Sequence, residues 1–290
     1  MKSILTGRIF VTICLLTSAQ SVFAASIGIF ANVCTYLPSS TTACPNTQLF
    51  TDYNASSSGP ISLTHVGTVN TQDLSIDYTL NAVADIGVLQ AYASSTVTGV
   101  TTDEIAYVES RAFTVDSLTI NGSGPQSGGF LKIGFNASAV GQYNNEFGFG
   151  EAGFWYYAGL DSTFQGWFSE NISNTTFDGT VWSHLMPFDF NVPFNVRTTL
   201  LARVDSGCSD PESFCSNWSA EGTSDVFNTL EITSVEVLDE FGNPINGTQI
   251  VADSGFNYSS LTAVPIPGAI WLFGSGLLGL IGMAKRKRAT

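Results

Sequence analysis

The stretch Leu74-Ser75-Ile76-Asp77-Tyr78-Thr79-Leu80 decides the fold class, because its apolar and polar residues alternate without a break. A period of two places the apolar side chains on one face of a β-strand and the polar ones on the other. The stretch from Phe194 to Val204 repeats the pattern, with Arg197 and Arg203 on its polar side. Both stretches therefore predict strands with one buried face.

Shorter apolar runs of the same kind lie at 113–115, 118–120, 131–135 and 230–232. After the last run Ser234 shifts the phase before Val235 and Val237, which predicts a β-bulge or a new strand. Turn signals separate the runs at Asn121-Gly122, Gly128-Gly129 and Gly242-Asn243-Pro244. No part of 25–263 keeps a helical period, so we expect an all-β, antiparallel β-sandwich with a jelly-roll-like arrangement.

The N-terminus has the pattern of a secretory signal peptide. Lys2 and Arg8 precede an apolar run, and small residues that suit signal peptidase end at Ala24. The apolar run is too short for a membrane anchor, which needs about 20 apolar residues. We therefore expect a signal peptide at 1–24 and a mature chain that begins at Ala25.

The C-terminus has the pattern of a membrane anchor. An uncharged, Gly-rich apolar segment at 268–284 is long enough to cross one hydrocarbon core of about 30 Å as a helix. Four consecutive cations follow it: Lys285, Arg286, Lys287 and Arg288. Because clustered cations stay on the cytoplasmic side, the preceding chain is expected outside the inner membrane.

The short motif Val264-Pro265-Ile266-Pro267, the apolar segment and the basic tail at 285–290 together resemble the PEP-CTERM sorting signal of Gram-negative bacteria. The resemblance covers 264–290 and departs from the family at Ile266, where the family has Glu. It implies processing by an exosortase in bacteria that make exopolysaccharide. Retention as a simple membrane anchor is the alternative.

The remaining 25–263, about 240 residues, is expected to form one ectodomain. Within it, 53–60 has the composition of an exposed loop, and 253–263 that of a stalk leading to the anchor.

The ectodomain is strongly acidic. It carries all 24 Asp and Glu residues of the chain but four cations, Arg111, Lys132, Arg197 and Arg203, which gives a formal charge of −20. Such a charge repels phosphate backbones, so nucleic-acid binding is not expected.

Four cysteines remain after signal removal, in two close pairs. Their spacing favours the disulfides Cys34–Cys44 and Cys208–Cys215 in an oxidising compartment. A metal site is the competing interpretation, but neither pair has metal-ligand spacing, and no metal or other cofactor is expected.

Aromatic residues are concentrated between Phe147 and Phe168. Large aromatic side chains usually fill the core of a sandwich, which is the favoured interpretation. The alternative is a carbohydrate-binding face that uses Trp155, Tyr157 and Trp167, because aromatic rings stack on sugars.

Enzyme signatures are missing from the sequence, and His65 and His184 lie beside strand-like residues that favour structural roles. Asp205, Asp210 and Glu212 carry oxygen ligands that suit calcium, but no calcium-loop motif accompanies them, so a solvated acidic loop is the favoured interpretation.

These features predict a non-enzymatic protein of the cell surface or extracellular matrix, exported through the secretion translocon, cut by signal peptidase and associated with exopolysaccharide or biofilm. The alternative is a secreted carbohydrate-binding or carbohydrate-active module that carries the same tail.

Overall fold

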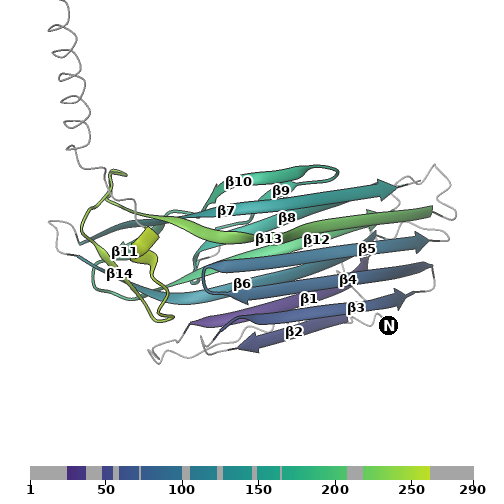
Figure 1. Ribbon diagram of the computed structural model, residues 1–290, viewed down its shortest axis with the longest axis horizontal. Coiled ribbons are helices and arrows are strands. Elements are labelled where there is room, and N and C mark those ends of the chain that lie inside the picture. Colours follow the sequence, from purple (N-terminus) through teal and green to yellow (C-terminus); the bar gives the residue numbers. More distant parts are fainter. Residues whose placement is uncertain are drawn as a thin grey trace, which may run out of the picture.

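The computed structural model describes residues 25–36, 48–54, 59–71, 73–99, 105–122, 127–145, 149–163, 165–207 and 218–261. Within these ranges the chain forms two antiparallel sheets that pack face to face, which confirms the expected all-β sandwich. The strands of both sheets run along the long axis of the molecule (Figure 1).

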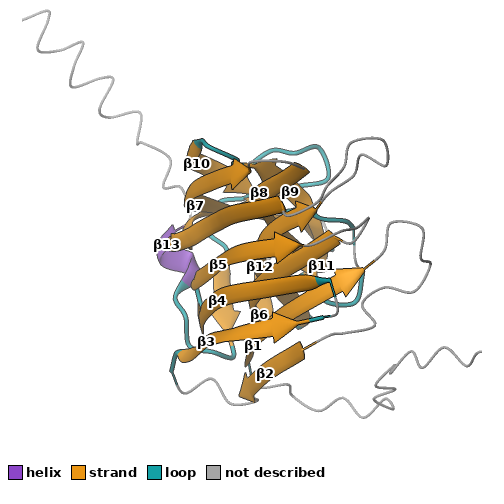
Figure 2. Ribbon diagram, turned by 90° about the vertical axis from the view of Figure 1, so that its right-hand side faces the viewer, coloured by secondary structure: helices purple, strands orange, loops and turns teal. Residues whose placement is uncertain are grey.

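The first sheet has the order β2 (Gln48–Asn54), β1 (Ser26–Tyr36), β6 (Ile105–Asn121), β12 (Phe194–Gly207), β8 (Phe149–Leu160) and β9 (Phe168–Asn171), and β14 (Gln249–Ala252) also pairs with β6. The second sheet has the order β10 (Thr176–Trp182), β7 (Gly128–Asn145), β13 (Trp218–Leu238), β5 (Val88–Gly99), β4 (Leu74–Asp85) and β3 (Ile61–Asn70), and β11 (Met186–Asp189) also pairs with β7. Among the described ranges the single helical segment is the short 3-10 helix η1 (Tyr258–Leu261), which lies beside β13 (Figure 2).

The core lies between the two sheets, where β6 packs against β4 and β5 and β12 packs against β5 and β13. The alternation that was predicted for 74–80 and 194–204 is present in β4 and β12, whose apolar sets point inward. The largest side chains sealed in the interior include Trp218, Phe135 and Phe154. Burying a large apolar side chain stabilises the fold by about 1.5–3 kcal/mol, so this interior is the main source of stability.

The phase shift at Ser234 is a β-bulge inside one long strand. The register of β13 against β7 slips between Ile232 and Ser234, and β13 continues to Leu238. The bulge returns Val235 and Val237 to the buried face, where both side chains are less than a tenth exposed. The first of the two expected alternatives is therefore confirmed.

The expected turn at Gly128-Gly129 is wrong, because both glycines open strand β7. A Cβ atom on Gly128 would lie 2.0 Å from the carbonyl oxygen of Phe188, and one on Gly129 would lie 2.2 Å from that of Leu238. These glycines are required by close backbone approach rather than by a turn.

The expected loop at 53–60 also begins later than predicted, because Tyr53 and Asn54 pair with β1 as the end of β2.

The expectation of a stalk at 253–263 is wrong for residues 253–261, which are the part of this segment that the structure describes. Residues 253–261 fold back onto the sandwich, and Tyr258 is only 3% exposed. Ser254 and Tyr258 both bind the carboxylate of Asp116 on β6, with oxygen distances of 2.6 and 3.1 Å. The partner lies more than a hundred residues earlier in the chain, so the local composition of the segment gave no sign of the contact.

Candidate functional site

Every arginine within the described residues projects from the outer face of the first sheet. Arg111 lies on β6, and Arg197 and Arg203 lie on β12. Their sequence neighbours on the same strands, such as Ala112 and Val204, point into the core. The period of two along each strand thus gathers three of the four ectodomain cations on one face.

The strand register brings aromatic and charged residues together on this face. Phe30 is paired with Arg111, Arg111 with Leu201, and Leu201 with Trp155, so one row crosses four strands. Directly opposed residues of antiparallel strands share a face and contact each other. We call this surface the arginine-aromatic face; its members are Phe30, Asn32, Tyr107, Glu109, Arg111, Phe113, Trp155, Tyr157, Asp161, Trp167, Arg197, Thr199, Leu201, Arg203 and Asp205.

Each guanidinium group of the face lies over at least one aromatic ring. The distances from the guanidinium carbon to the ring centre are 5.2 Å for Arg111 over Phe30, 5.4 Å for Arg111 over Trp167, 5.1 Å for Arg197 over Phe113, 4.4 Å for Arg203 over Tyr107 and 5.8 Å for Arg203 over Trp155. Stacking of this kind occupies the flat side of the guanidinium and leaves its edge for hydrogen bonds.

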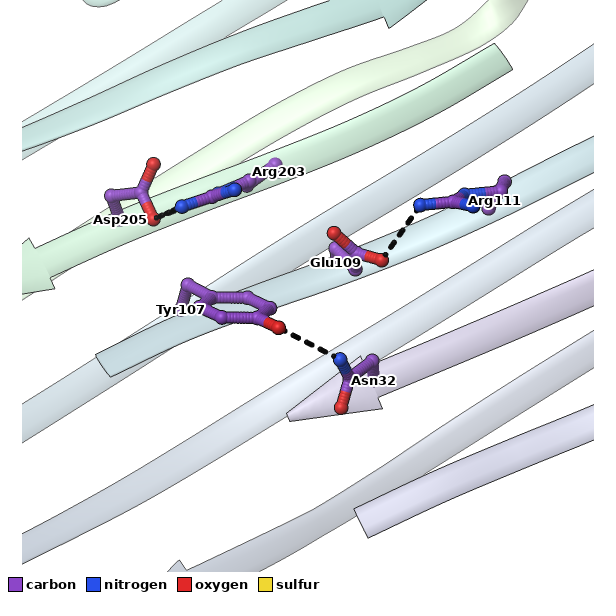
Figure 3. Close-up of polar contacts among 6 residues, drawn as sticks. All are labelled: Asn32, Tyr107, Glu109, Arg111, Arg203 and Asp205. Carbon is purple, nitrogen blue, oxygen red and sulfur yellow. Dashed lines mark hydrogen bonds and ion pairs between the residues drawn. The ribbon is translucent and has the colours of Figure 1, made fainter. Parts of the chain in front are cut away.

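Each arginine of the face also forms an ion pair with a carboxylate. The nitrogen-to-oxygen distances are 3.2 Å for Arg111–Glu109, 2.6 Å for Arg197–Asp161 and 2.7 Å for Arg203–Asp205. Figure 3 shows the first and third pairs, from neighbouring strands β6 and β12. Because each positive charge has a negative partner, the three ion pairs add no net charge to the face.

Glu109 is buried and Asp205 is half-buried, and desolvation raises the pKa of both carboxyls. The positive charge of Arg111 and Arg203 opposes the effect on Glu109. Burial also raises the pKa of the Tyr107 hydroxyl, and the charge of Glu109 adds to that effect. The two carboxylates help to fix the guanidinium groups in place, because Glu109 accepts a hydrogen bond from Arg111 and Asp205 accepts one from Arg203.

Asn32 on β1 adds a buried amide to the face. It is 7% exposed, and its Nδ2 donates a hydrogen bond of 3.0 Å to the hydroxyl oxygen of Tyr107 (Figure 3). Asn32 Oδ1 and Arg111 Nε form no hydrogen bond with any part of the chain that the structure describes. Buried polar atoms without a hydrogen bond are rare in folded proteins. Two such atoms on one face therefore distinguish this part of the surface from an ordinary apolar core.

A pocket of about 300 Å³ opens on the same face. Its lining consists of Phe30, Arg111, Phe113, Tyr157, Asp161, Trp167, Arg197 and Thr199. The volume is at the small end of the range for ligand sites, which suits one or two sugar rings rather than a large cofactor. Aromatic surface and the edges of two ion-paired arginines therefore meet in one concavity.

The loop that carries Trp167 is held in place by contacts on both sides. The hydroxyl oxygen of Tyr157 lies within hydrogen-bond distance of two carbonyl oxygens, those of Leu160 at 2.8 Å and Thr163 at 2.7 Å. On the other side, His184 Nε2 lies 3.1 Å from the carbonyl oxygen of Gly166. Trp167 itself is 38% exposed, so an anchored loop presents an open indole ring at the rim of the pocket.

The predicted aromatic cluster divides between core and surface because strand β8 alternates. Phe154 and Tyr156 point into the core, whereas Trp155 and Tyr157 lie on the arginine-aromatic face. Of the three nominated sugar-binding residues, Trp155 is half-buried, Tyr157 is 2% exposed and Trp167 is exposed. Trp167 and Tyr157 line the pocket, and Trp155 does not.

Sequence reasoning did not find Phe30, Asp161 or the arginines as site residues. A signal was present, since Arg197 and Arg203 were placed opposite the apolar set of their strand. The sequence does not show which distant strands pair, and it is this pairing that brings Phe30 and Arg111 beside Arg197 and Arg203.

The two histidines have packing partners. His65 lies against Tyr78, with Nδ1 3.2 Å from the Tyr78 hydroxyl oxygen, and His184 stacks on Phe168 at 4.5 Å between ring centres. Of the weighed calcium ligands, Asp205 is paired with Arg203, while Asp210 and Glu212 lie outside the described residues. No group of three or more potential metal ligands occurs in the described part of the chain.

Several predicted features lie outside the described residues: the signal peptide, the sorting motif, the apolar tail segment, the basic tail, Cys44, Cys208 and Cys215. Cys34 lies within the described residues, where it is fully buried and takes part in a disulfide bond. The identity of its partner stays a prediction.

Neither a protein-family model nor a curated protein matches the sequence. No helical turn in the described ranges has the length and apolarity of a membrane crossing.

Proposed function

We propose that this chain is an exported, non-enzymatic protein of the cell surface or extracellular matrix whose sandwich binds exopolysaccharide. The observation that carries the proposal is the pocket on the arginine-aromatic face, in which the exposed ring of Trp167 adjoins the paired Arg197 and Asp161. Sugar sites combine these two elements, an aromatic surface for the C–H face of the ring and planar polar groups for its hydroxyls.

Three properties of the face support a sugar over other ligands. The pocket is preformed, because contacts from Tyr157 and His184 anchor its rim. Its arginines are already neutralised by carboxylates, which suits a hydroxyl-rich ligand better than a highly charged one. The ectodomain charge of −20 also disfavours nucleic acid and anionic lipid.

The export route is part of the same proposal. The signal peptide at 1–24 directs the chain to the translocon and signal peptidase, and the tail at 264–290 holds it in the inner membrane as a helix until an exosortase-type enzyme acts. We also propose that the sandwich has a jelly-roll-like arrangement of strands. After processing, the ectodomain would be released to the cell surface or matrix.

The test is affinity electrophoresis of the full-length chain, purified in mild detergent, through gels that contain polysaccharide extracted from the native host. We expect the gel to retard the wild type and to retard Trp167→Ala less strongly. Phe241→Ala is the matched control, because Phe241 is an even more exposed aromatic residue, at 77%, and lies outside the pocket. Equal mobility of all three proteins with and without polysaccharide contradicts the proposal.

A carbohydrate-active module is the second candidate, and one observation favours it. Burial raises the pKa of Glu109 and of Asp205 on the same face, and glycoside hydrolysis requires a carboxylic acid with a raised pKa. Release of reducing sugar ends by the wild type, and its loss in Glu109→Gln, would replace the non-enzymatic proposal with this one.

A further inference from the structure

A second and larger concavity lies on the outer face of the second sheet. Its volume is about 1070 Å³, and it crosses strands β3, β4, β5, β13 and β7 to reach the turn between β9 and β10. We call it the polar groove. Val140 and Thr176, which pair with each other on the same face, line it beside ten further side chains that point out of the sheet: Val66, Thr68, Asp77, Thr79, Ser94, Thr96, Gln142, Asn144, Glu221 and Thr223.

The strand register arranges these side chains in two parallel rows. One row runs Thr68, Asp77, Thr96, Glu221 and Asn144, and each member is the direct partner of the next. The other row runs Val66, Thr79, Ser94, Thr223 and Gln142 in the same way. Four strand spacings of about 4.8 Å make each row about 19 Å long, which is the length of several sugar units rather than of one small molecule.

The chemistry of the rows is uniform. Nine of the ten side chains carry a hydroxyl, an amide or a carboxylate, and none of the residues that line the groove is Lys or Arg. Thr68 donates a hydrogen bond of 2.5 Å to Asp77, which shows that neighbours in a row are close enough to act together. A surface with many donors and acceptors and two negative charges matches an uncharged, hydroxyl-rich chain and repels an anionic one.

One end of the groove is closed by a turn that is fixed to β7. The amide of Gly141 donates to the carbonyl oxygen of Thr175 at 3.0 Å, and Asn174 Oδ1 accepts from the amide of Tyr143 at 2.9 Å. Asn174 holds the left-handed backbone, with φ of 55°, that places its side chain for this bond. The groove is therefore preformed, which lowers the entropic cost of binding a flexible polymer.

We propose that the polar groove binds a segment of a neutral polysaccharide that lies across the five strands. The site is separate from the pocket on the arginine-aromatic face, because the two concavities share no residue and open on different sheets. The inference therefore goes beyond the proposed function: a chain with two sugar sites on its two outer faces can join two polysaccharide strands. Joint binding would raise the apparent affinity for a polymer without any new contact.

The test uses the full-length chain in gels that contain dextran, mannan or hydroxyethyl cellulose as neutral probes, and alginate as the anionic probe. The variant is Thr96→Val with Thr223→Val, which removes one hydroxyl from each row and keeps the β-branched shape that strands favour. Thr64→Val is the matched control, because Thr64 is exposed on the same sheet outside the groove.

We expect at least one neutral gel to retard the wild type and Thr64→Val equally, and the double variant to bind about tenfold more weakly. Trp167→Ala separates this proposal from the proposed function, since it alters only the other pocket and should leave the groove-dependent part of the retardation. Equal retardation of the double variant and the wild type, retardation by alginate alone, or no retardation on any neutral gel overturns the inference.

Discussion

Trp167 lies over the guanidinium group of Arg111, with 5.4 Å between the guanidinium carbon and the ring centre. The two residues come from the loop between β8 and β9 and from strand β6, which are not neighbours in the sheet. Phe30 flanks the same guanidinium at 5.2 Å, and Glu109 binds it through a hydrogen bond of 3.2 Å. The exposed indole is thus positioned by a cation that is itself fixed by a buried carboxylate.

Arg111→Lys should weaken sugar binding several-fold while it preserves the fold. Lysine keeps a positive charge beside Glu109 but lacks the planar group that stacks between Phe30 and Trp167, so we expect a stability loss within about 1 kcal/mol. Tryptophan emission should shift to the red as Trp167 becomes more hydrated. Lys132→Arg is the control, because Lys132 lies over Trp182 at 4.1 Å on the other sheet. Unchanged emission and binding in Arg111→Lys would argue against this positioning role.

The protein should be more stable at mildly acidic pH than at alkaline pH. Burial raises the pKa of the Glu109, Asp116 and Asp205 carboxyls, so the folded chain holds these protons more tightly than the unfolded chain does. The contribution of these three groups to the free energy of unfolding is complete below the ordinary carboxyl pKa, about pH 4. It is lost as the pH rises through their raised pKa values. We expect the thermal midpoint to fall by several degrees between about pH 4.5 and about pH 8.

Two variants test the assignment of that pH dependence. Glu109→Gln removes one of the buried titrating groups and should make the decline shallower. Asp239→Asn should not do so, because hydrogen bonds from Asn243 lower the pKa of the Asp239 carboxyl, which is the opposite direction. A thermal midpoint that rises from acidic to alkaline pH in the wild type would show that other groups dominate.

Tyr258→Phe should destabilise the sandwich by about 1–3 kcal/mol, as is usual when a buried hydrogen bond to a carboxylate is removed. The hydroxyl of Tyr258 donates to Asp116 at 3.1 Å, which ties the C-terminal segment to β6. Urea denaturation followed by circular dichroism measures the change. Tyr92→Phe serves as the control, since the hydroxyl of Tyr92 makes no hydrogen bond among the described residues. Equal effects of the two variants would mean that the contact does not stabilise the segment.

Gly141→Ala should be strongly destabilising, by more than about 2 kcal/mol, and should also displace the turn that closes the polar groove. A Cβ atom at this position would lie 2.1 Å from the carbonyl oxygen of Ile172, which is backbone and cannot rotate away. Gly179→Ala is the matched control in a neighbouring strand, because its nearest atom would be at 3.7 Å. Thermal denaturation of both variants checks the prediction, and similar midpoints would contradict it.

Intact mass of the protein recovered from its native host tests the predicted processing and disulfides. We expect a C-terminus near 264–267 and a gain of about four hydrogens on reduction, two for each disulfide. A chain intact through Thr290 would set the exosortase proposal aside and leave a membrane-anchored protein. A gain of two hydrogens would limit the chain to the one disulfide that includes Cys34.

Local patterns in the sequence were sufficient for the strands of the core. Alternation at 74–80 and 194–204 predicted β4 and β12, and the phase shift at Ser234 predicted a bulge or a new strand, of which the bulge is present in β13. These features follow from which side of a pleated strand each residue occupies, a property that neighbouring residues determine together. Gly128 and Gly129 were misread because a glycine required by close backbone approach looks the same in sequence as a glycine required by a turn.

The sequence by itself determined that the chain is acidic, that it is built from strands with one buried face, and that Arg197 and Arg203 lie opposite the buried set. Only the tertiary structure decided which strands are neighbours, and with that which side chains meet. Strand pairing joins Phe30 to Arg111 and lines up the two rows of the polar groove, and the packing of η1 against the sandwich brings Tyr258 to Asp116, 142 residues away. Such contacts depend on the register between distant segments, which the pattern within any one segment does not specify.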